Sequence, residues 1–476
     1  MYDPAWYVSL HQEIPKNWQS MWSSDVDGGI ETVFSPSTEE DPRAIYIDKA
    51  RWEYLKNMQD NQAAVANDIK DLVSPTRRVG RSIFLDRAGI KLANIDRVFN
   101  VTLSKVSYIK QQDMEHLFYV DLAGGPGAFT QYIQYRRPNS RGWGITIKGY
   151  PPTEWHLLDT EIMDNRFNII NGERGDGNLI LAAEEFVATV NQQTSLPIIG
   201  NDINIPGSTR GVDVVVADGW MEPDKTSDAK YKNLTSKHGS GNIYHYAETL
   251  NFDLVAIELA VAVQLVRVGG NIVCKVTDTN TERMAQLLYL VSQCFEVFTI
   301  FKPISSRPAN AEKYVIGLYK RSNIENIIKI LVRLQNFISA EHLRLEAKEP
   351  IAISLAPSRI ISKIDDKFAA WLTTTNNFYL DDQIKYTERI KNYTEAKGIT
   401  SEDIDLERLY TFWRLPGMYG VDYHPELSKV PITGTRRSFK SEEEKERYKV
   451  QESQTRIGGL WRTSGQGRGR GRGRGN

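Results

Sequence analysis

Two charged residues of this chain stand in or directly after strongly apolar runs, where charges are rare. Asp218 follows the run 212–217, and Lys275 lies inside the run 271–276. Lysine and aspartate are seldom buried unless they have a partner. A lysine that is buried beside a second cation has a lowered pKa and can act as a general base near neutral pH. The structural alternative is an edge strand whose lysine faces the solvent.

A glycine-rich segment closes another apolar run, 116–124, and leads into a helix-like stretch. The segment consists of Ala123, Gly124, Gly125, Pro126, Gly127, Ala128 and Phe129. Glycine lets the backbone approach a ligand closely, and the N-terminus of the helix beyond favours an anionic group. No Lys-Ser/Thr pair follows the glycines, so the segment is not a phosphate-binding P-loop. It predicts either a cofactor-binding loop or a structural turn without a ligand.

Three more charged residues are candidates for the same site, although each has a plainer explanation by itself. Asp176 lies between two glycines, where its carboxylate can accept hydrogen bonds from an adenine amino group or form a simple Asx-turn. Lys91 lies on the helix-like stretch 84–94, and Glu312 precedes the last apolar run. A lysine on a helix is most often exposed surface. Lys91 therefore indicates a functional site only in combination with the other candidate residues.

Alternating strand-like and helix-like patterns over residues 76–320 predict an α/β layered domain. The strand-like runs are 116–124, 143–148, 212–217, 271–276, 295–301 and 314–319, and a long apolar helix is expected at 246–268. A short loop joins the last two runs, which predicts an antiparallel pair at one edge of the sheet. Ligands of open α/β sheets bind beyond the carboxyl ends of the strands. The glycine loop, Asp218 and Lys275 are therefore expected to meet there.

Three further regions flank this domain. Residues 1–75 form an N-terminal extension rich in aromatic residues. Residues 321–430 are expected to be mostly helical and to cover a sheet edge or bind a protein partner. One apolar helical face there is made by Ile324, Ile327, Ile328, Leu331, Leu334 and Ile338. Residues 431–476 are predicted to be disordered, and their terminal Arg-Gly repeat binds RNA or a partner, or only aids solubility.

The overall charge neither supports nor excludes a nucleic-acid partner. Of 476 residues, 41% are hydrophobic and 25% are charged, and the net charge is −1, so any RNA site must be a local patch. Candidates for phosphate contacts, or for a solvated basic face, are Arg77, Arg78, Arg81 and Arg87. The only two cysteines lie in apolar runs, which suits an intracellular protein without a disulfide framework. No transmembrane run, signal peptide or metal site is expected.

Four of these charged residues form an ordered set. Lys91, Asp218, Lys275 and Glu312 occur in this order, with the glycine loop between the first two. The set resembles the K-D-K-E tetrad of the FtsJ-like (RrmJ-type) ribose 2′-O-methyltransferases. Segments 87–94, 123–127, 144–149 and 302–314 look like the cap-specific branch of that family, which contains eukaryotic cap-1 methyltransferases and homologues in large DNA viruses. The resemblance covers residues 80–320, about half of the chain.

The resemblance implies a Rossmann-like methyltransferase fold with a mostly parallel sheet and an antiparallel last strand. It implies S-adenosyl-L-methionine as the cofactor, bound by the glycine loop, Asp176 and Asp218. The implied reaction transfers a methyl group to the ribose 2′-hydroxyl of the first transcribed nucleotide of capped mRNA, converting cap-0 to cap-1. The implied location is intracellular, in the cytoplasm or the nucleus, or in the viral factory or virion if the protein is viral.

The resemblance also assigns roles to the tetrad. Methyl transfer to a hydroxyl is an in-line displacement, in which the enzyme aligns the reacting groups and removes a proton. Lys275 is the implied general base, and Lys91 tunes it and holds the hydroxyl. Asp218 and Glu312 orient the two ammonium groups and balance their charge. A carboxylate placed too close would instead raise a lysine pKa, so geometry decides whether this scheme works.

Two positions depart from the family pattern. Many methyltransferases have an acidic residue after the second strand to hold the cofactor ribose, whereas this chain has Thr146, Ile147 and Lys148, so no ribose ligand is assigned. Ala128 replaces a frequent second glycine, and we expect it to be tolerated if its φ is negative.

Other functions remain open at this point. One is 2′-O-methylation of ribosomal or transfer RNA. The segment 306–312 favours the mRNA cap over these substrates. Another is a non-catalytic RNA-binding subunit, which the complete tetrad disfavours. The loop 220–244, directly after Asp218, is expected to be a lid or an RNA-gripping loop. The tryptophans of the N-terminal extension stack on a methylated guanine or, as we favour, pack in a core: Trp6, Trp18, Trp22 and Trp52.

Overall fold

A computed structural model shows how the chain folds. It describes residues 32–35, 44–62, 82–102, 116–149, 154–155, 166–195, 211–221, 246–346, 357, 359–396, 406–413 and 415. All of them fall in one compact unit that ends at Leu427. Several predicted features lie outside the described residues: Trp6, Trp18, Trp22, Arg77, Arg78, Arg81, most of the loop 220–244, and the Arg-Gly tail.

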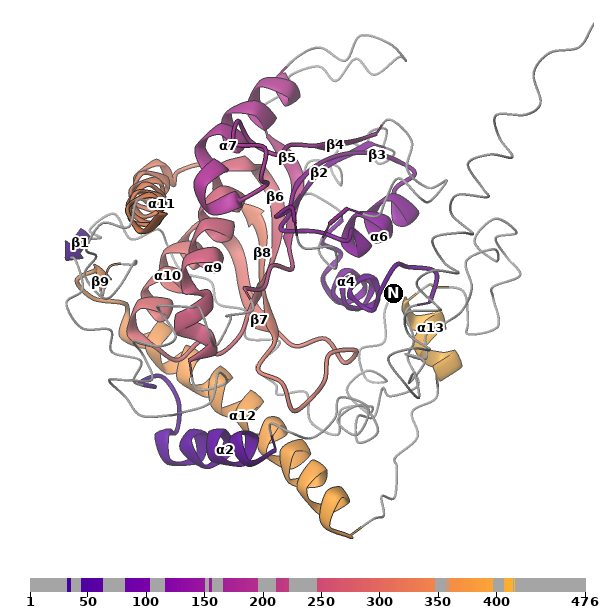
Figure 1. The fold of residues 1–476 in the computed structure, drawn as a ribbon, viewed down its shortest axis with the longest axis vertical. Coiled ribbons are helices and arrows are strands. Elements are labelled where there is room, and N and C mark those ends of the chain that lie inside the picture. The colour runs from indigo at the N-terminus through magenta and orange to yellow at the C-terminus, as the bar shows by residue number, and fades with distance from the viewer. Residues whose placement is uncertain are drawn as a thin grey trace, which may run out of the picture. The chain divides into compact units, whose positions relative to one another are not determined.

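The centre of the fold is a seven-stranded sheet with the order β4-β3-β2-β5-β6-β8-β7 (Figure 1). Its strands are β2 (His116–Leu122), β3 (Asn139–Ile145), β4 (Phe167–Ile169), β5 (Val212–Ala217), β6 (Val266–Val276), β7 (Phe295–Phe301) and β8 (Lys313–Lys320). Strand β8 runs antiparallel to both of its neighbours, and the other paired strands are parallel. The predicted fold class, a mostly parallel sheet with an antiparallel last strand, is confirmed. A separate two-stranded sheet joins β1 (Thr32–Ser35) and β9 (Arg359–Ile361).

The longest strand begins earlier than its sequence indicated. Strand β6 starts at Val266 and passes through Gly269 and Gly270, which looked like a turn before the strand. Gly269 has a φ of +80°, and the pairing of β6 with β5 shifts register near this point. A glycine pair of this kind makes a bulge inside a strand. The pair therefore bends β6 but does not end it.

Helices cover both faces of the sheet (Figure 1). They are α2 (Lys49–Asn61), α4 (Ala88–Phe99), α6 (Ala128–Arg136), α7 (Leu179–Ser195), α9 (Ala247–Leu265), α10 (Glu282–Gln293), α11 (Glu325–Glu346), α12 (Asp366–Ala396) and α13 (Leu406–Trp413). Alternate residues of β5 separate the two cores. Val215 packs with α7, α9, α10 and α11, whereas Val214 and Val216 pack with α4, α6 and α13. Both faces of the sheet are therefore buried, as parallel strands require.

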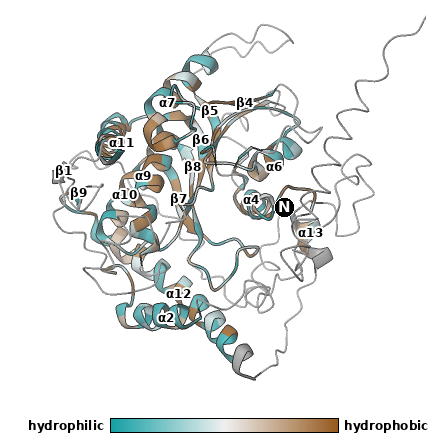
Figure 2. Ribbon diagram, viewed as in Figure 1, coloured by the Kyte–Doolittle hydropathy of each residue, from teal (hydrophilic) through white to brown (hydrophobic). Residues whose placement is uncertain are grey.

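Apolar residues concentrate in the sheet and in α9, whereas α2 and α11 are largely hydrophilic outside their buried faces (Figure 2). Five residues of the apolar helical face predicted at 324–338, in and directly before α11, are buried: Ile324, Ile327, Leu331, Leu334 and Ile338. Across the described residues, no helix combines the length and the apolarity that crossing a membrane needs.

The N-terminal helix α2 packs along the C-terminal helix α12 (Figure 1). Trp52 is 8% exposed and packs in a small apolar cluster with Leu55, Met58 and Leu380. Core packing is thus the role of the one predicted tryptophan that the structure describes. Lys56 makes a buried ion pair with Asp278, 2.5 Å from Nζ to Oδ2, just beyond the end of β6. A segment before the sheet domain in sequence and one after it therefore pack together beside the sheet.

Candidate active site

The loops after β2 and β5 meet where the strand order reverses. From β2 the chain proceeds outward to β3 and β4, and it then returns to β5 on the other side of β2. The carboxyl ends of strands at such a switch point are where open α/β sheets bind ligands. A Cβ on Gly219, after β5, would lie 2.9 Å from the Ala123 side chain, after β2. The two loops are thus in direct contact.

Glycine is required in the loop after β2 for steric reasons. Gly127 has a φ of +114°, which side chains rarely adopt. A Cβ on Gly124 would collide with the carboxylate of Asp121. Ala128 is the first residue of α6, with a helical backbone and a buried side chain. A helical backbone has a negative φ, so alanine is tolerated at position 128, as the sequence predicted.

The turns after β4, β3 and β2 form one continuous rim beside this loop. The backbone oxygen of Asp176, after β4, accepts a hydrogen bond from the Lys148 amide at 2.8 Å. The Oγ1 atom of Thr146, after β3, accepts one from the Gly125 amide at 3.3 Å. The Asp176 side chain accepts from the Asn178 amide at 3.0 Å, which is an Asx-type contact, and from Arg174 Nε at 3.1 Å. Burial would raise the pKa of Asp176, but these two donors lower it below its ordinary value.

A second carboxyl lies beneath the rim. Asp121, near the end of β2, is fully buried, and its Oδ2 accepts hydrogen bonds from the Thr130 hydroxyl and amide. Its Oδ1 has no hydrogen-bond partner among the described residues. Burial raises the pKa of Asp121 to about 7, the Thr130 hydroxyl opposes this, and the charge on Asp218 adds to it. The site therefore holds an acid that is partly protonated at neutral pH.

Lys275 and Asp218 form an ion pair at the ends of β6 and β5. The Nζ of Lys275 lies 3.0 Å from Asp218 Oδ1 and also donates to the backbone oxygen of Asp218 at 2.6 Å. Only 9% of Lys275 is exposed, so it is not an edge residue facing solvent. Two contacts from one residue fix the orientation of the amine. Strand β6 thus presents the Lys275 amine, held by two contacts with Asp218, at the carboxyl end of the sheet.

Lys91 and Glu312 form the second ion pair, 2.9 Å from Nζ to Oε2. Glu312 Oε1 accepts a hydrogen bond from Ser306 Oγ at 2.6 Å. Burial would raise the pKa of Glu312, but the charges of Lys91 and then Lys275 hold it at about 2. Burial would lower the pKa of Lys91, but Glu312 and Asp218 raise it above its ordinary value. The four residues are thus brought together, with Lys91 held as a cation.

Several neighbours of the tetrad were not predicted as site residues. Tyr314 donates its hydroxyl to Asp218 Oδ1 at 2.9 Å, because β8 places it directly opposite Lys275. Lys302 donates to the backbone oxygens of Asn310 and Glu312, the latter at 3.0 Å. Burial lowers the pKa of Lys302 to about 7, against the charge of Glu312. Lys302 and Tyr314 both belong to the segment 302–314 that signalled the site, but only the pairing of β6 with β8 shows that Tyr314 lies beside Asp218.

Arg87 is the one predicted phosphate contact among the described residues. Its guanidinium donates to the backbone oxygen of Ser305 at 3.2 Å. Nearby, Asn94 Oδ1 accepts a hydrogen bond from the Ile304 amide at 2.8 Å. Both contacts tie α4, which carries Lys91, to the loop that carries Glu312. Arg87 therefore has a structural partner next to the site.

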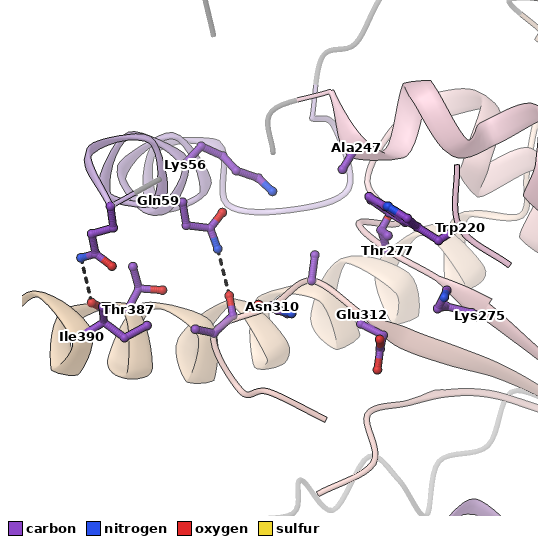
Figure 3. A pocket seen from close by; sticks show the side chains of 13 residues that line it. Lys56, Gln59, Trp220, Ala247, Lys275, Thr277, Asn310, Glu312, Thr387 and Ile390 are labelled. Atoms are coloured by element: carbon purple, nitrogen blue, oxygen red, sulfur yellow. Dashed lines mark hydrogen bonds between the residues drawn. The ribbon is translucent and has the colours of Figure 1, made fainter. Parts of the chain in front are cut away.

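Lys275 and Glu312, one member of each ion pair, line a groove of about 210 Å³ (Figure 3). It is lined by Lys56, Gln59, Gln62, Trp220, Ala247, Lys275, Thr277, Ala309, Asn310, Ala311, Glu312, Thr387 and Ile390. Its far wall comes from α2 and α12, where Gln59 donates to the Ala309 oxygen at 2.9 Å and Gln62 to the Thr387 oxygen at 3.1 Å. The exposed indole of Trp220 lies at the end nearest Lys275. Within the described ranges, no cluster of His, Cys, Asp and Glu suits a metal ion.

Comparison with known proteins supplies an independent finding. The family model described as FtsJ-like methyltransferase matches residues 84–320. A mouse protein named cap-specific mRNA (nucleoside-2′-O-)-methyltransferase 1 is 28% identical over 424 residues, which cover 87% of this chain and 46% of that protein. The Drosophila melanogaster protein of the same name is 27% identical over 387 residues, 78% of this chain and 44% of that protein. The chain thus spans less than half the length of these relatives.

Similarity to solved structures is weaker. The human methyltransferase-like protein 13, solved in complex with SAH, has 9% sequence identity and a TM-score of 0.27. The similarity covers 52% of this chain and 90% of that one.

Proposed function

Because residues 84–320 belong to the FtsJ-like methyltransferase family, we propose that this chain methylates the ribose 2′-hydroxyl of the first transcribed nucleotide of capped mRNA, converting cap-0 to cap-1. The observation that carries the proposal is the pair of ion pairs, Lys91 with Glu312 and Lys275 with Asp218, beside the glycine loop. The names of the relatives support the cap as the substrate.

S-adenosylmethionine supplies an electrophilic methyl group when it is bound. The residues of the rim fit this cofactor. Backbone between Ala123 and Pro126 is only partly buried, so a ligand can approach it closely. The Asp176 carboxylate is 35% exposed and offers an acceptor for amino groups. The glycine loop through Phe129, Asp176 and Asp218 are therefore the proposed cofactor contacts.

The hydrogen bonds of Lys275 suit a general base. A neutral amine has two N–H bonds and one lone pair. In Lys275, both N–H bonds are used by Asp218, through Oδ1 and the backbone oxygen. The lone pair is then left to accept the proton of a ribose hydroxyl. Asp218, itself held by Tyr314, thus orients the base and does not itself take up the proton.

Lys91 complements the base as a cation. Because Glu312 and Asp218 raise its pKa, Lys91 stays protonated at neutral pH and can donate to the oxygen of the same hydroxyl. A positive charge beside the oxygen stabilises the negative charge that develops as the proton leaves. Glu312 and Asp218 balance the two lysines, which limits the cost of burying charge.

The groove is the proposed path of the RNA into the site. Trp220 is 43% exposed and offers a flat surface on which a base can stack. The amides of Gln59 and Gln62 and the side chain of Asn310 offer polar contacts along the groove. Phosphate contacts of Arg77, Arg78, Arg81 and Arg87 remain part of the proposal. We also propose that the chain divides into domains 1–75, 76–320, 321–430 and 431–476, that the last two domains bind a protein partner, and that the location is intracellular.

A product-mapping experiment tests the function. The chain is incubated with cofactor labelled in the methyl group and with capped RNA, uncapped RNA of the same sequence, ribosomal RNA or transfer RNA. Nuclease digestion then identifies the methylated nucleotide. Label on the 2′-oxygen of the first nucleotide, only when the RNA is capped, supports the proposal. Label in ribosomal or transfer RNA alone favours the alternative substrate, and binding of RNA without methylation favours a non-catalytic subunit.

A prediction on cofactor binding follows from Asp176. Asp176→Ala removes a charged acceptor, an interaction of about 1.5–3 kcal/mol. Calorimetry without RNA should therefore show binding of S-adenosylmethionine weakened by about 10- to 100-fold. Glu173→Ala, an exposed side chain of the same turn, is the matched control and should leave the affinity unchanged. Equal affinities for the two variants would remove Asp176 from the cofactor site.

A further inference from the structure

Three contacts fix Glu312, and the mechanism above uses only one of them. Its Oε2 accepts from Lys91 at 2.9 Å, its Oε1 from the Ser306 hydroxyl at 2.6 Å, and its backbone oxygen from Lys302 Nζ at 3.0 Å. Lys302 and the start of β8 at Lys313 already hold the backbone of Glu312. The side chain can still rotate about its own bonds, so the two hydrogen bonds to its carboxylate decide its orientation.

The hydroxyl of Ser306 has one proton to donate, and this proton goes to the carboxylate of Glu312. Ser306 is 2% exposed. Burial would raise the pKa of Glu312, but the charges of Lys91 and Lys275 and this hydrogen bond hold it at about 2. Near neutral pH the carboxylate is therefore ionised and can only accept. A hydrogen bond to an ionised group is roughly twice as strong as one between neutral groups, which favours one orientation of the carboxylate.

Ser306 is itself anchored to the helix that carries Lys91. Its amide donates to the backbone oxygen three residues before it, at 2.9 Å. Arg87, at the start of α4, and Asn94, within α4, bond to the backbone of the two residues that precede Ser306. The contacts form a closed ring. It runs from α4 to the loop, from the loop through the Ser306 hydroxyl to the carboxylate, and from the carboxylate back to Lys91 on α4.

We propose that Ser306 is a positioning residue for the methyl transfer: its hydroxyl orients the Glu312 carboxylate so that Lys91 is held where it can donate to the ribose oxygen. This role rests on the proposed function of Lys91. In this scheme Ser306 does not contact the substrate and acts only through Glu312. Without the hydroxyl the carboxylate can turn away from Lys91, and the ammonium group is then no longer fixed beside the reacting oxygen.

Ser306→Ala should lower the single-turnover rate of methyl transfer by about tenfold, the order of one hydrogen bond to a charged group. The KM for RNA and the affinity for S-adenosylmethionine should not change, because the groove and the glycine loop are untouched. Ser305→Ala is the matched control and should keep the wild-type rate. Ser305 is 1% exposed, its Oγ has no hydrogen-bond partner among the described residues, and alanine keeps the backbone oxygen that Arg87 uses.

A double-mutant cycle separates a positioning role from a structural one. If Ser306 acts through Glu312, Ser306→Ala should lower the rate little further in protein that already carries Glu312→Ala. A structural role would multiply the two losses, because the loop would be damaged whichever residue stands at position 312. Multiplied losses, or a wild-type rate for Ser306→Ala alone, would overturn the proposal.

Denaturant unfolding tests the same contact without RNA or cofactor, and so independently of the proposed function. The coupling between Lys91→Met and Glu312→Ala is the departure of the double variant's unfolding equilibrium constant from the product of the two single effects. This coupling should fall by about threefold or more when Ser306 is replaced by alanine. An unchanged coupling would contradict the positioning role. A reduced coupling, together with no methylation of any RNA by the wild type, would count against the proposed function alone.

Discussion

Replacing Lys275 with alanine should lower the single-turnover rate of methyl transfer by about 10²–10⁴-fold, the range that a positioned general base contributes. The variant removes the nitrogen that Asp218 holds through two contacts at the end of β6. The glycine loop is untouched, so calorimetry should show nearly unchanged binding of S-adenosylmethionine. Lys363→Ala, at a side chain 72% exposed, is the control and should keep the wild-type rate.

Lys275→Arg separates a base from a cation. Arginine keeps the positive charge but does not lose its proton in a protein, so this variant should be nearly as inactive as alanine. Glu312, with its pKa held at about 2, and Lys91, with its pKa raised, do not change charge near pH 7. Near wild-type rates for Lys275→Arg would mean that Lys275 acts only by its charge.

Breaking the buried pair between Lys56 and Asp278 should destabilise the whole unit. The two side chains are 1% and 5% exposed, so Lys56→Met leaves an uncompensated charge in the interior. Loss of one partner of a buried pair costs about 3–5 kcal/mol. Lys313 lies near Asp278, and burial lowers its pKa to about 8 against the charge of Asp278. Below pH 8 its positive charge partly replaces Lys56, so the loss of stability should be larger at pH 9 than at pH 7.

Denaturant unfolding at the two pH values measures this effect. Lys49→Met is the control, because Lys49 and Glu53 form an exposed pair whose loss should cost less than about 1 kcal/mol. The double variant Lys56→Met with Asp278→Leu should recover much of the stability, since no charge is left buried alone. Methyl transfer by Lys56→Met should also fall, because α2 supports the loop before Glu312 through Gln59. A loss under 1 kcal/mol at both pH values would contradict the prediction.

The sequence by itself determined the features that depend on local pattern. The run 212–217 matches β5 at both ends, because a short run in which five of six residues are apolar is typical of a strand buried on both faces. The position of Asp218 at the tip of that strand followed directly. Gly124 and Gly127 marked the loop because their backbone positions exclude a Cβ. The order of the tetrad and the segments around it were sufficient to indicate the family.

Only the tertiary structure decided which charges face one another. Lys91 reaches Glu312 across 221 positions of sequence, and Tyr314 reaches Asp218 through the register of β8 on β6. The sequence scheme had Asp218 and Glu312 orient the two ammonium groups, but it did not say which carboxylate meets which lysine. The structure pairs Lys91 with Glu312 and Lys275 with Asp218. Pairing and burial set how strongly such charges interact and how far they shift one another's pKa values. Neither can be read from residue types, because they depend on strand order and on what covers each side chain.

The same reason explains why α2 and α12 escaped notice as parts of the site. Nothing local in α2 indicates that Lys56 and Gln59 reach the ends of β6 and the loop before Glu312. These contacts join segments that are distant in sequence, and they form only when the strands assemble into the sheet. They therefore cannot be inferred from any single stretch of sequence.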